Sequence, residues 1–268
     1  MILTNPPQTH ASESGHWYDR QGNSVWEVTG AKGQKVKPDI RHARKLGLLP
    51  GATSIGNCAA KEQLVRWRIE QGMLAAYTLP PVPGDTYEDW LARVFRDSEE
   101  HGRSAADRGT LIHAAIQGHF EGKAPEPEFW PYVQLVREVV LKHCGEQAWT
   151  AEKSFGCEMG YGGKADLSCD AWLLDFKSKA AKDMDDPGKK LVYDEHPQQL
   201  AAYRRGLRIP KARCANVFVS REEPIIVKFC EHNEETLERG LSMFDHLLRY
   251  WQVKNRYDSS FSHLKEAA

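Results

Sequence analysis

The sequence predicts an α/β or α+β domain that carries a helical N-terminal part. Before residue 145 the apolar residues recur mostly at helical spacing, whereas short apolar runs typical of strands fill much of 149–229. One helical segment interrupts these strands, and an amphipathic helix follows them. Helices, then strands with an interposed helix, then a closing helix are typical of a sheet covered by helices.

Length and composition are those of a soluble globular protein. The chain has 268 residues, of which 41% are apolar and 27% are charged, enough for one large or two small domains. The formal net charge is −1, so any binding of nucleic acid requires a local cluster of positive charge. No apolar run approaches the roughly 20 residues of a membrane span, and the first residues do not resemble a signal peptide. We therefore expect a cytoplasmic protein without a membrane partner.

The six cysteines are scattered and include no CxxC pair, which argues against a zinc ribbon. In the cytoplasm such thiols are expected to be reduced packing residues rather than disulfides. Their spacing also does not fit an iron–sulfur cluster, so none is expected.

Residues 1–84 are predicted to form an N-terminal hairpin and helical segment. In the polar first part, 16–19 and 24–28 could pair as a small hairpin. Helical signals then predict helices over 40–46, capped by Asp39, and over 53–79. The buried side of the second helix is predicted to contain Leu64, Val65, Trp67, Ile69 and Met73. The proline-rich run 80–84 ends this part of the chain.

Residues 85–257 are predicted to form the core domain, and 258–268 a flexible tail. Apolar periodicity predicts helices over 86–100, 104–120, 127–144 and 197–207, and a closing helix capped by Asn233. Strands are expected at 149–155, on both sides of a turn at 168–170, at 217–219 and at 225–229. The segment 178–195 is rich in Lys and Asp, which predicts a mobile polar loop.

The central stretch contains the residues with the clearest chemistry. In Asp175-Phe176-Lys177 the strand period sends Asp175 and Lys177 to one face, and Asp166 follows Gly162-Gly163 on the preceding apolar run. Two carboxylates, the Phe176 carbonyl oxygen and waters would suit a hard cation such as Mg²⁺, with Lys177 beside the metal-bound water. The non-functional alternative is a surface Asp–Lys ion pair that contributes less than about 1 kcal/mol to the stability of the fold. The glycine turn and the apolar strands favour a functional site.

Other candidates are weaker when judged from the residues alone. A lone helical histidine such as His113 is more often a packing residue, and Gln199 with Tyr203 could be an ordinary polar pair one helical turn apart. Glu152 could be an outer metal ligand or only a charged strand end. For phosphate contacts the candidates are Lys179, Arg204 and Arg205, for which a solvated surface is the alternative.

These motifs together resemble the PD-(D/E)XK nuclease superfamily, and specifically its RecB-like exonuclease branch, which includes phage-type and mitochondrial genome maintenance exonucleases. The similar segments are 162–166, 175–177, Gln199-x-x-x-Tyr203, the helical motif Arg108-Gly109-Thr110-Leu111-Ile112-His113, and 52–55. The resemblance covers about 50 to 205, and the motifs occur in the family's order. Position 175 is Asp rather than the Glu commoner in the superfamily, although Asp is usual in this branch.

The resemblance implies a restriction-endonuclease-like core, with a central mixed sheet flanked by helices, and hydrolysis of DNA phosphodiesters with Mg²⁺ or Mn²⁺. It makes His113, Asp166 and Asp175 the metal ligands, beside the Phe176 carbonyl considered above, Lys177 the catalytic lysine, and Gln199 and Tyr203 helpers near substrate or lysine. It further suggests recombination, repair or phage replication in a bacterial or phage-infected cell, with a single-strand-annealing or replication protein as partner. It leaves the oligomeric state open.

The sequence thus predicts a metal-dependent deoxyribonuclease, with an exonuclease as the leading form. A catalytically silent nucleic-acid-binding or assembly protein on the same fold is the first alternative. A metal phosphoesterase that acts on nucleotides is the second, because function belongs to the site and not to the fold.

Overall fold

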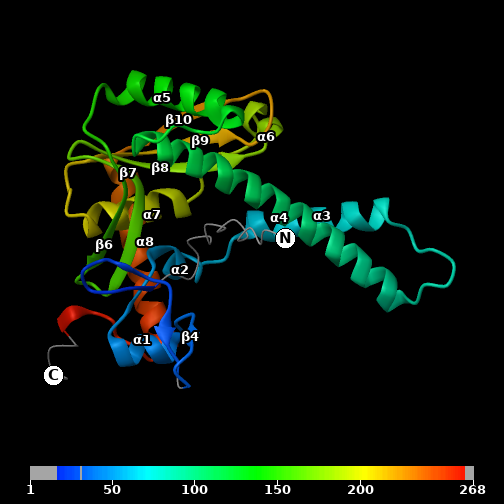
Figure 1. Ribbon diagram of the computed structural model, residues 1–268, viewed down its shortest axis with the longest axis horizontal. Coiled ribbons are helices and arrows are strands. Elements are labelled where there is room, and N and C mark those ends of the chain that lie inside the picture. Colours follow the sequence, from blue (N-terminus) through cyan, green and yellow to red (C-terminus); the bar gives the residue numbers. More distant parts are fainter. Residues whose placement is uncertain (1–16, 31, 263–268) are drawn as a thin grey trace, which may run out of the picture.

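The computed structural model describes residues 17–30 and 32–262, and its centre is a five-stranded mixed sheet (Figure 1). The strand order is β10-β9-β8-β7-β6. The bounds are β6 Thr150–Cys157, β7 Tyr161–Ser168, β8 Trp172–Lys179, β9 Arg213–Ser220 and β10 Val227–His232. Strands β8 and β9 are parallel, and the other neighbours are antiparallel. The predicted mixed sheet flanked by helices is confirmed.

Helices cover both faces of this sheet (Figure 1). On one face lie α4 (Tyr87–Phe120) and α5 (Trp130–Cys144), where Ile112, Ile116 and Val136 are buried with Leu174 and Val217 of the strands. On the other face lie α7 (Glu195–Gly206) and α8 (Glu234–Lys254), which bury their apolar sides in a second core cluster. Helix α7 belongs to the connection that the parallel β8–β9 pair requires.

The N-terminal part packs beside α7 and α8. Strands β1 (Trp17–Tyr18), β2 (Ser24–Val25) and β5 (Leu49–Pro50) form one small sheet, so the predicted hairpin exists and gains a third strand. The predicted His16 lies outside the described residues. The remaining elements here are β3 (Val28–Thr29), β4 (Lys35–Val36), α1 (Ile40–Leu46) and α2 (Ala52–Gly56).

Tyr257 ties this part to the end of the chain. Its hydroxyl donates to the carbonyls of Leu48 and Ala43 at 2.9 and 3.2 Å. Residues 258–262, predicted as part of the tail, also pack: the buried Ser259 donates to the carbonyl of Gly160 at 2.5 Å.

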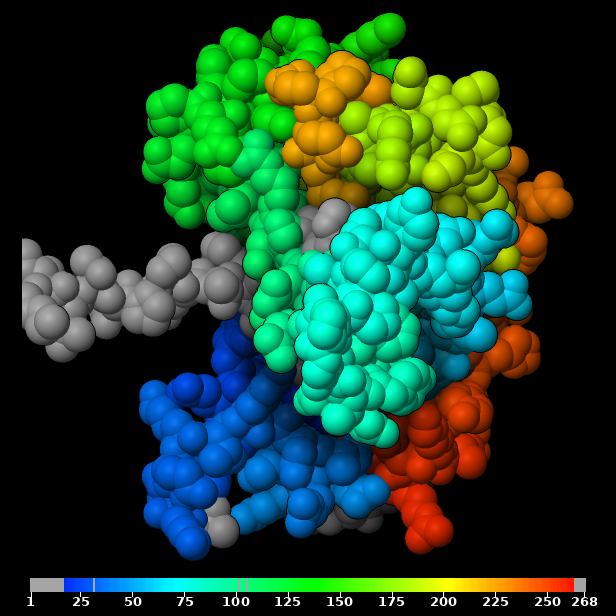
Figure 2. Space-filling model, turned by 90° about the vertical axis from the view of Figure 1, so that its right-hand side faces the viewer, coloured from blue at the N-terminus to red at the C-terminus, as the bar shows by residue number. Residues whose placement is uncertain are grey.

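Helix α3 (Glu62–Thr78) and the first half of α4 form an arm that projects from the sheet (Figure 1). In Figure 2 this arm lies in front, in cyan, because that view looks onto its side of the molecule. The predicted buried side of α3 is wrong, because Leu64, Val65, Ile69 and Met73 are exposed and Ala75 is its buried residue. The arm packs mainly on itself, so apolar periodicity here does not mark a face of the core. The Trp90 indole N–H donates to the Leu79 carbonyl at 2.7 Å and holds the two helices together.

Two further predictions are corrected. Residues 86–100 and 104–120 belong to the single 34-residue helix α4, which Thr86 caps by accepting from the Asp89 N–H at 3.1 Å. The segment 178–195 is only partly a loop, because β8 continues to Lys179 and α6 (Ala181–Asp185) follows it. Met184 of α6 is fully buried and fixes this short helix to the core. Among the described helices, none combines the length and the apolar content that a bilayer crossing requires.

Candidate active site where two strands separate

The candidate site lies where β7 and β8 stop pairing. The two strands are joined by a tight turn and pair through two residue pairs next to that turn. Asp166 on β7 and Asp175 on β8 are the next positions in this register, and both are buried. The Asp166 carboxylate accepts a hydrogen bond from the Phe176 N–H at 2.7 Å. A side chain thus takes the place of a bond between the strands and opens the sheet at this point.

Helix α4 brings His113 to the same point. The His113 Nε2 lies 3.0 Å from Asp166 Oδ2, and the ring packs edge-on against Phe176 with the centroids 6.0 Å apart. The helix passes close to the sheet because Gly109, about one turn earlier, lies against Ser178 of β8. A Cβ at Gly109 would come within 2.3 Å of the Ser178 hydroxyl oxygen. The glycine of the sequence motif therefore sets the approach of the histidine.

Asp175, Lys177, Gln199 and Tyr203 form one hydrogen-bonded group. Lys177 Nζ lies 2.8 Å from Asp175 Oδ1, as expected for alternate residues of a strand. Gln199 of α7 links this pair, since its Nε2 donates to Asp175 Oδ1 at 3.1 Å and its Oε1 accepts from Lys177 at 3.2 Å. Gln199 Nε2 also lies 3.1 Å from the Tyr203 hydroxyl. The structure therefore brings these four predicted residues together.

The two aspartates differ in their electrostatic surroundings. Burial raises the pKa of Asp166, but His113, Lys177 and the Phe176 N–H outweigh burial and hold that pKa below its usual value. Burial also raises the pKa of Asp175, and the charge of Asp166 adds to that effect, so this pKa lies above its usual value despite Lys177. Two neighbouring buried carboxylates share one lysine, so their negative charge is only partly neutralised. This arrangement favours the binding of a cation.

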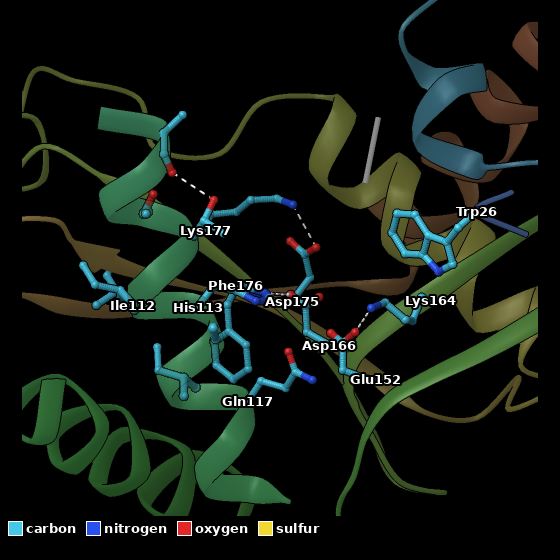
Figure 3. Close-up of a pocket in the computed structure, with 17 residues that line it drawn as sticks. Trp26, Ile112, His113, Gln117, Glu152, Lys164, Asp166, Asp175, Phe176 and Lys177 are labelled. Atoms are coloured by element: carbon cyan, nitrogen blue, oxygen red, sulfur yellow. Dashed lines mark hydrogen bonds and ion pairs between the residues drawn. The ribbon is translucent and has the colours of Figure 1, made fainter. Parts of the chain in front are cut away.

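Glu152 lies across from Asp166 in the register of β6 and β7. The pairing passes from Ala151 to Lys153 and skips this position. Glu152 has a φ of 53°, a left-handed conformation that is uncommon for a residue with a side chain. Its carboxylate forms an ion pair with Lys164, and both residues line the same cleft as the aspartates (Figure 3). Such strain is typical of sites where function fixes a side chain.

The cleft has a volume of about 380 Å³ and lies between α4 and the separating strands. Figure 3 shows Lys177 and Asp175 pointing toward one another, with Gln117 and Glu152 on the opposite side and Trp26 beyond Lys164. Trp26 is 46% exposed and follows β2, so the N-terminal part contributes to the wall. Sequence reasoning missed Trp26, and an aromatic residue within a polar segment was the signal.

Sequence reasoning also missed two buried polar residues behind Asp175. Asn216 of β9 donates from Nδ2 to Asp175 Oδ2 at 2.6 Å, and His232 Nε2 of β10 lies 2.7 Å from Asn216 Oδ1. Asn216 is fully buried, and His232 is 7% exposed. The signal for Asn216 was a polar residue inside the apolar run 214–219.

The two arginines predicted as DNA contacts lie apart from this group, whereas Lys179 follows Lys177 on β8. Arg204 pairs with Glu234 at 2.5 and 2.7 Å, and Arg205 pairs with Asp245 at 2.6 and 3.0 Å, so both guanidiniums join α7 to α8. Neither arginine lines the cleft. Lys179 lies at the end of β8, with its Nζ 4.9 Å from the centre of the Tyr193 ring. Lys179 is half-buried, and this burial lowers the pKa of its ammonium group.

The donor atoms suit a hard divalent cation, because carboxylate oxygens dominate the group and an imidazole adds a nitrogen. Within residues 17–30 and 32–262, however, no three His, Cys, Asp or Glu side chains converge on one point. Asp175 Oδ1 faces Lys177 and Gln199, whereas Asp166 faces His113. Holding a cation between the aspartates therefore requires Asp175 to exchange one of these contacts.

Neither a protein-family description nor a curated protein sequence matches the chain. Among solved structures, the chain is similar to a candidate exonuclease from Eubacterium rectale, with 16% identity over 55% of this chain and 68% of that one, and a TM-score of 0.41. It is also similar to an alkaline exonuclease (LHK-Exo) from Laribacter hongkongensis, with 15% identity over 70% of this chain and 96% of that one, and a TM-score of 0.32. These values are too low to transfer an activity, so function has to be inferred from the site itself.

Proposed function

We propose that this chain is a metal-dependent nuclease that hydrolyses phosphodiester bonds of DNA. One observation carries the proposal: two buried carboxylates lie side by side where two strands separate, one in contact with His113 and the other with Lys177, and both line an open cleft. A structural ion pair has no need of a second carboxylate, of an imidazole or of access to solvent.

In the proposed site His113, Asp166 and Asp175 hold Mg²⁺ or Mn²⁺, with the Phe176 carbonyl as a further candidate ligand. When bound, such a cation lowers the pKa of a water and offsets the negative charge that develops on phosphate. Hydrolysis adds water to phosphorus and breaks one phosphorus–oxygen bond, and charge grows on the phosphate oxygens as this happens. The Lys177 ammonium, held by Gln199, is placed to stabilise that charge or to orient the water.

The proposal extends to an exonuclease that acts in recombination, repair or phage replication in the cytoplasm of a bacterial or phage-infected cell. A single-strand-annealing or replication protein is the proposed partner. This extension is supported by the family resemblance of the motifs.

The test is digestion of end-labelled linear DNA and of circular DNA, single- and double-stranded, with Mg²⁺, Mn²⁺ or EDTA. We expect metal-dependent loss of the linear substrates, and Lys177→Ala should reduce the rate at least about 100-fold. The matched control is Lys153→Ala, which removes an exposed lysine of β6 and should leave the rate unchanged. Cutting of circles would identify an endonuclease instead.

A catalytically silent nucleic-acid-binding protein is the second candidate, and the lack of three converging donors among the described residues favours it. If wild type and Lys177→Ala both leave every substrate intact but retard it in a gel, this second function replaces the first. A wild type that neither cuts nor retards DNA would contradict both.

A further inference from the structure

Asp175, Asn216 and His232 form a row across three neighbouring strands. In the parallel register of β8 and β9, Asn216 lies directly opposite Asp175. In the antiparallel register of β9 and β10, Asn216 lies opposite Cys230, so His232 is two residues along on the same face. The strand register therefore builds the contacts of 2.6 Å and 2.7 Å that join the three side chains.

The chemistry of each group fixes the orientation of the next. The Asp175 carboxylate accepts, so Asn216 must turn its Nδ2 donor toward it. The Asn216 Oδ1 then faces His232, and only a proton on Nε2 of the imidazole satisfies that oxygen. Without this donor, the amide of Asn216 could turn by half a rotation and present its oxygen to a carboxylate.

The two oxygens of Asp175 are thus used differently. Oδ1 contacts Gln199 and Lys177, of which Lys177 lines the cleft, and Oδ2 is held from within the sheet by Asn216. Asn216 is fully buried and does not line the cleft, so it cannot touch DNA or a cation there. Any influence on the reaction has to pass through Asp175.

We propose that Asn216 and His232 are positioning residues that fix the carboxylate of Asp175 in the orientation that binds the divalent cation. This inference rests on the function proposed above, because it requires Asp175 to be a metal ligand. Residues behind a metal ligand typically change metal affinity or activity by about 10-fold to 100-fold when they are replaced.

The first test measures Mn²⁺ binding to the full chain by calorimetry, without DNA. Asn216→Leu keeps similar volume but removes the donor to Asp175, and we expect it to weaken Mn²⁺ binding at least about 10-fold. In the nuclease assay the same variant should require more Mg²⁺ and show a lower kcat at limiting Mg²⁺. Its KM for DNA should stay unchanged, because Asn216 lies outside the cleft.

The second test compares two variants at one position. His232→Gln can still donate a hydrogen bond to Asn216 Oδ1, whereas His232→Leu cannot. If the row orients Asp175, the Gln variant should bind Mn²⁺ within about 2-fold of wild type and the Leu variant more weakly than that. A role in packing alone would leave the two variants equal, or favour Leu in this buried place. This comparison decides the question even if Asn216→Leu fails to fold.

Asp175→Ala separates failure of this inference from failure of the proposed function. If Asp175→Ala abolishes Mn²⁺ binding while a folded Asn216→Leu binds like wild type, the positioning role is wrong and the metal site stands. If the two variants at position 232 bind equally, the positioning role of His232 is likewise overturned. If Asp175→Ala binds Mn²⁺ like wild type, the metal site itself is wrong, and the inference falls with it.

Discussion

A lysine on a strand has a long and flexible side chain, so its ammonium is held in one place only if other groups bind it. Gln199 does this for Lys177, because its amide contacts Lys177 and Asp175 at once and is itself within 3.1 Å of the Tyr203 hydroxyl. The ring of Tyr203 lies close to Gly163, where a Cβ would come within 2.9 Å of it. Gly163 lies inside β7, paired with Phe155 of β6, and its missing side chain makes room for this group of contacts.

We predict that Gln199→Leu lowers kcat on linear DNA by about 10-fold to 100-fold with little change in fold. The amide leaves while the side-chain volume stays similar, so Lys177 loses one of its partners. Steady-state kinetics at saturating Mg²⁺ would measure this. Gln134→Leu, at an exposed position of α5, is the control. An unchanged kcat in Gln199→Leu would show that Lys177 needs no such support.

His196 makes stability depend on pH. It is 5% exposed, and burial, reinforced by Lys177 and Lys179, lowers its pKa to about 3. Its Nδ1 accepts the Tyr193 N–H at 3.1 Å, which requires this nitrogen to be unprotonated. Because the pKa in the unfolded chain is about 6.5, the unfolded state binds the extra proton between pH 6.5 and 3. The stability due to neutral His196 is therefore complete above about pH 6.5 and is lost as the pH falls.

The expected loss from this residue is about 2 kcal/mol between pH 7 and pH 5, from about 1.4 kcal/mol for each pH unit below 6.5. Urea unfolding at the two pH values would measure it. His196→Asn keeps an acceptor for the Tyr193 N–H and should remove most of this pH dependence. The control is His143→Asn, at an exposed position, which should leave the pH dependence of the unfolding free energy unchanged. Equal pH dependence in wild type and His196→Asn would refute the assignment.

At the scale of residues, local patterns were enough for Asp175 and Lys177, because the strand period alone places them on one face. They could not supply Asn216 and His232. Those contacts depend on which strands become neighbours, and β8 and β9 are separated by more than thirty residues of chain. Arg204 and Arg205 were predicted as DNA contacts, but the structure pairs them with carboxylates of another helix. The sequence could not show this, because an arginine on a helix gives the same pattern whether it faces phosphate or a carboxylate.

Among the elements, α4 carries the closest fit between helix and sheet. We predict that Gly109→Ala destabilises the protein by about 1–3 kcal/mol and lowers nuclease activity, because the new methyl group meets the Ser178 hydroxyl and pushes His113 away from Asp166. Thermal unfolding and nuclease rates would measure both effects.

Gly118→Ala is the matched control on the same helix. There the nearest atom lies 3.7 Å from the new Cβ, an ordinary contact, so this change should stabilise α4 by about 0.5–1 kcal/mol. The double variant Gly109→Ala/Ser178→Gly removes the side chain that collides and should recover most of the loss. A double variant as impaired as Gly109→Ala would mean that the collision is not the cause.

Apolar periodicity and capping residues predict the helices and strands of the core, but they do not predict the arm. Apolar residues of α3 recur as they would on a buried face, and nothing local indicates that they meet solvent. The continuity of α4 was also hidden, because the charged, glycine-containing stretch 96–103 resembles a break between two helices. Both features are decided by tertiary packing.

For the whole molecule, the arm should be the least stable part of the described chain. Of the 17 residues of α3, only Ala75 is buried, whereas β7 and β8 are buried along most of their length. We predict that amides of 62–95 exchange with deuterium faster than those of 161–179 at neutral pH, because opening the arm exposes little apolar surface. Mass spectrometry of exchanged peptides would measure this. Equal protection in the two regions would mean that the arm is covered in solution, for example by another copy.

Because α4 is one continuous helix, it connects the arm mechanically to the candidate site. A helix of 34 residues is roughly 50 Å long, and one end of α4 forms the arm while His113 lies near the other. The close contact of Gly109 with Ser178 lies between the arm and His113, and it is the point about which α4 would pivot. A partner that binds the arm and changes the orientation of α4 would therefore shift the imidazole of His113 relative to Asp166 without contacting the cleft.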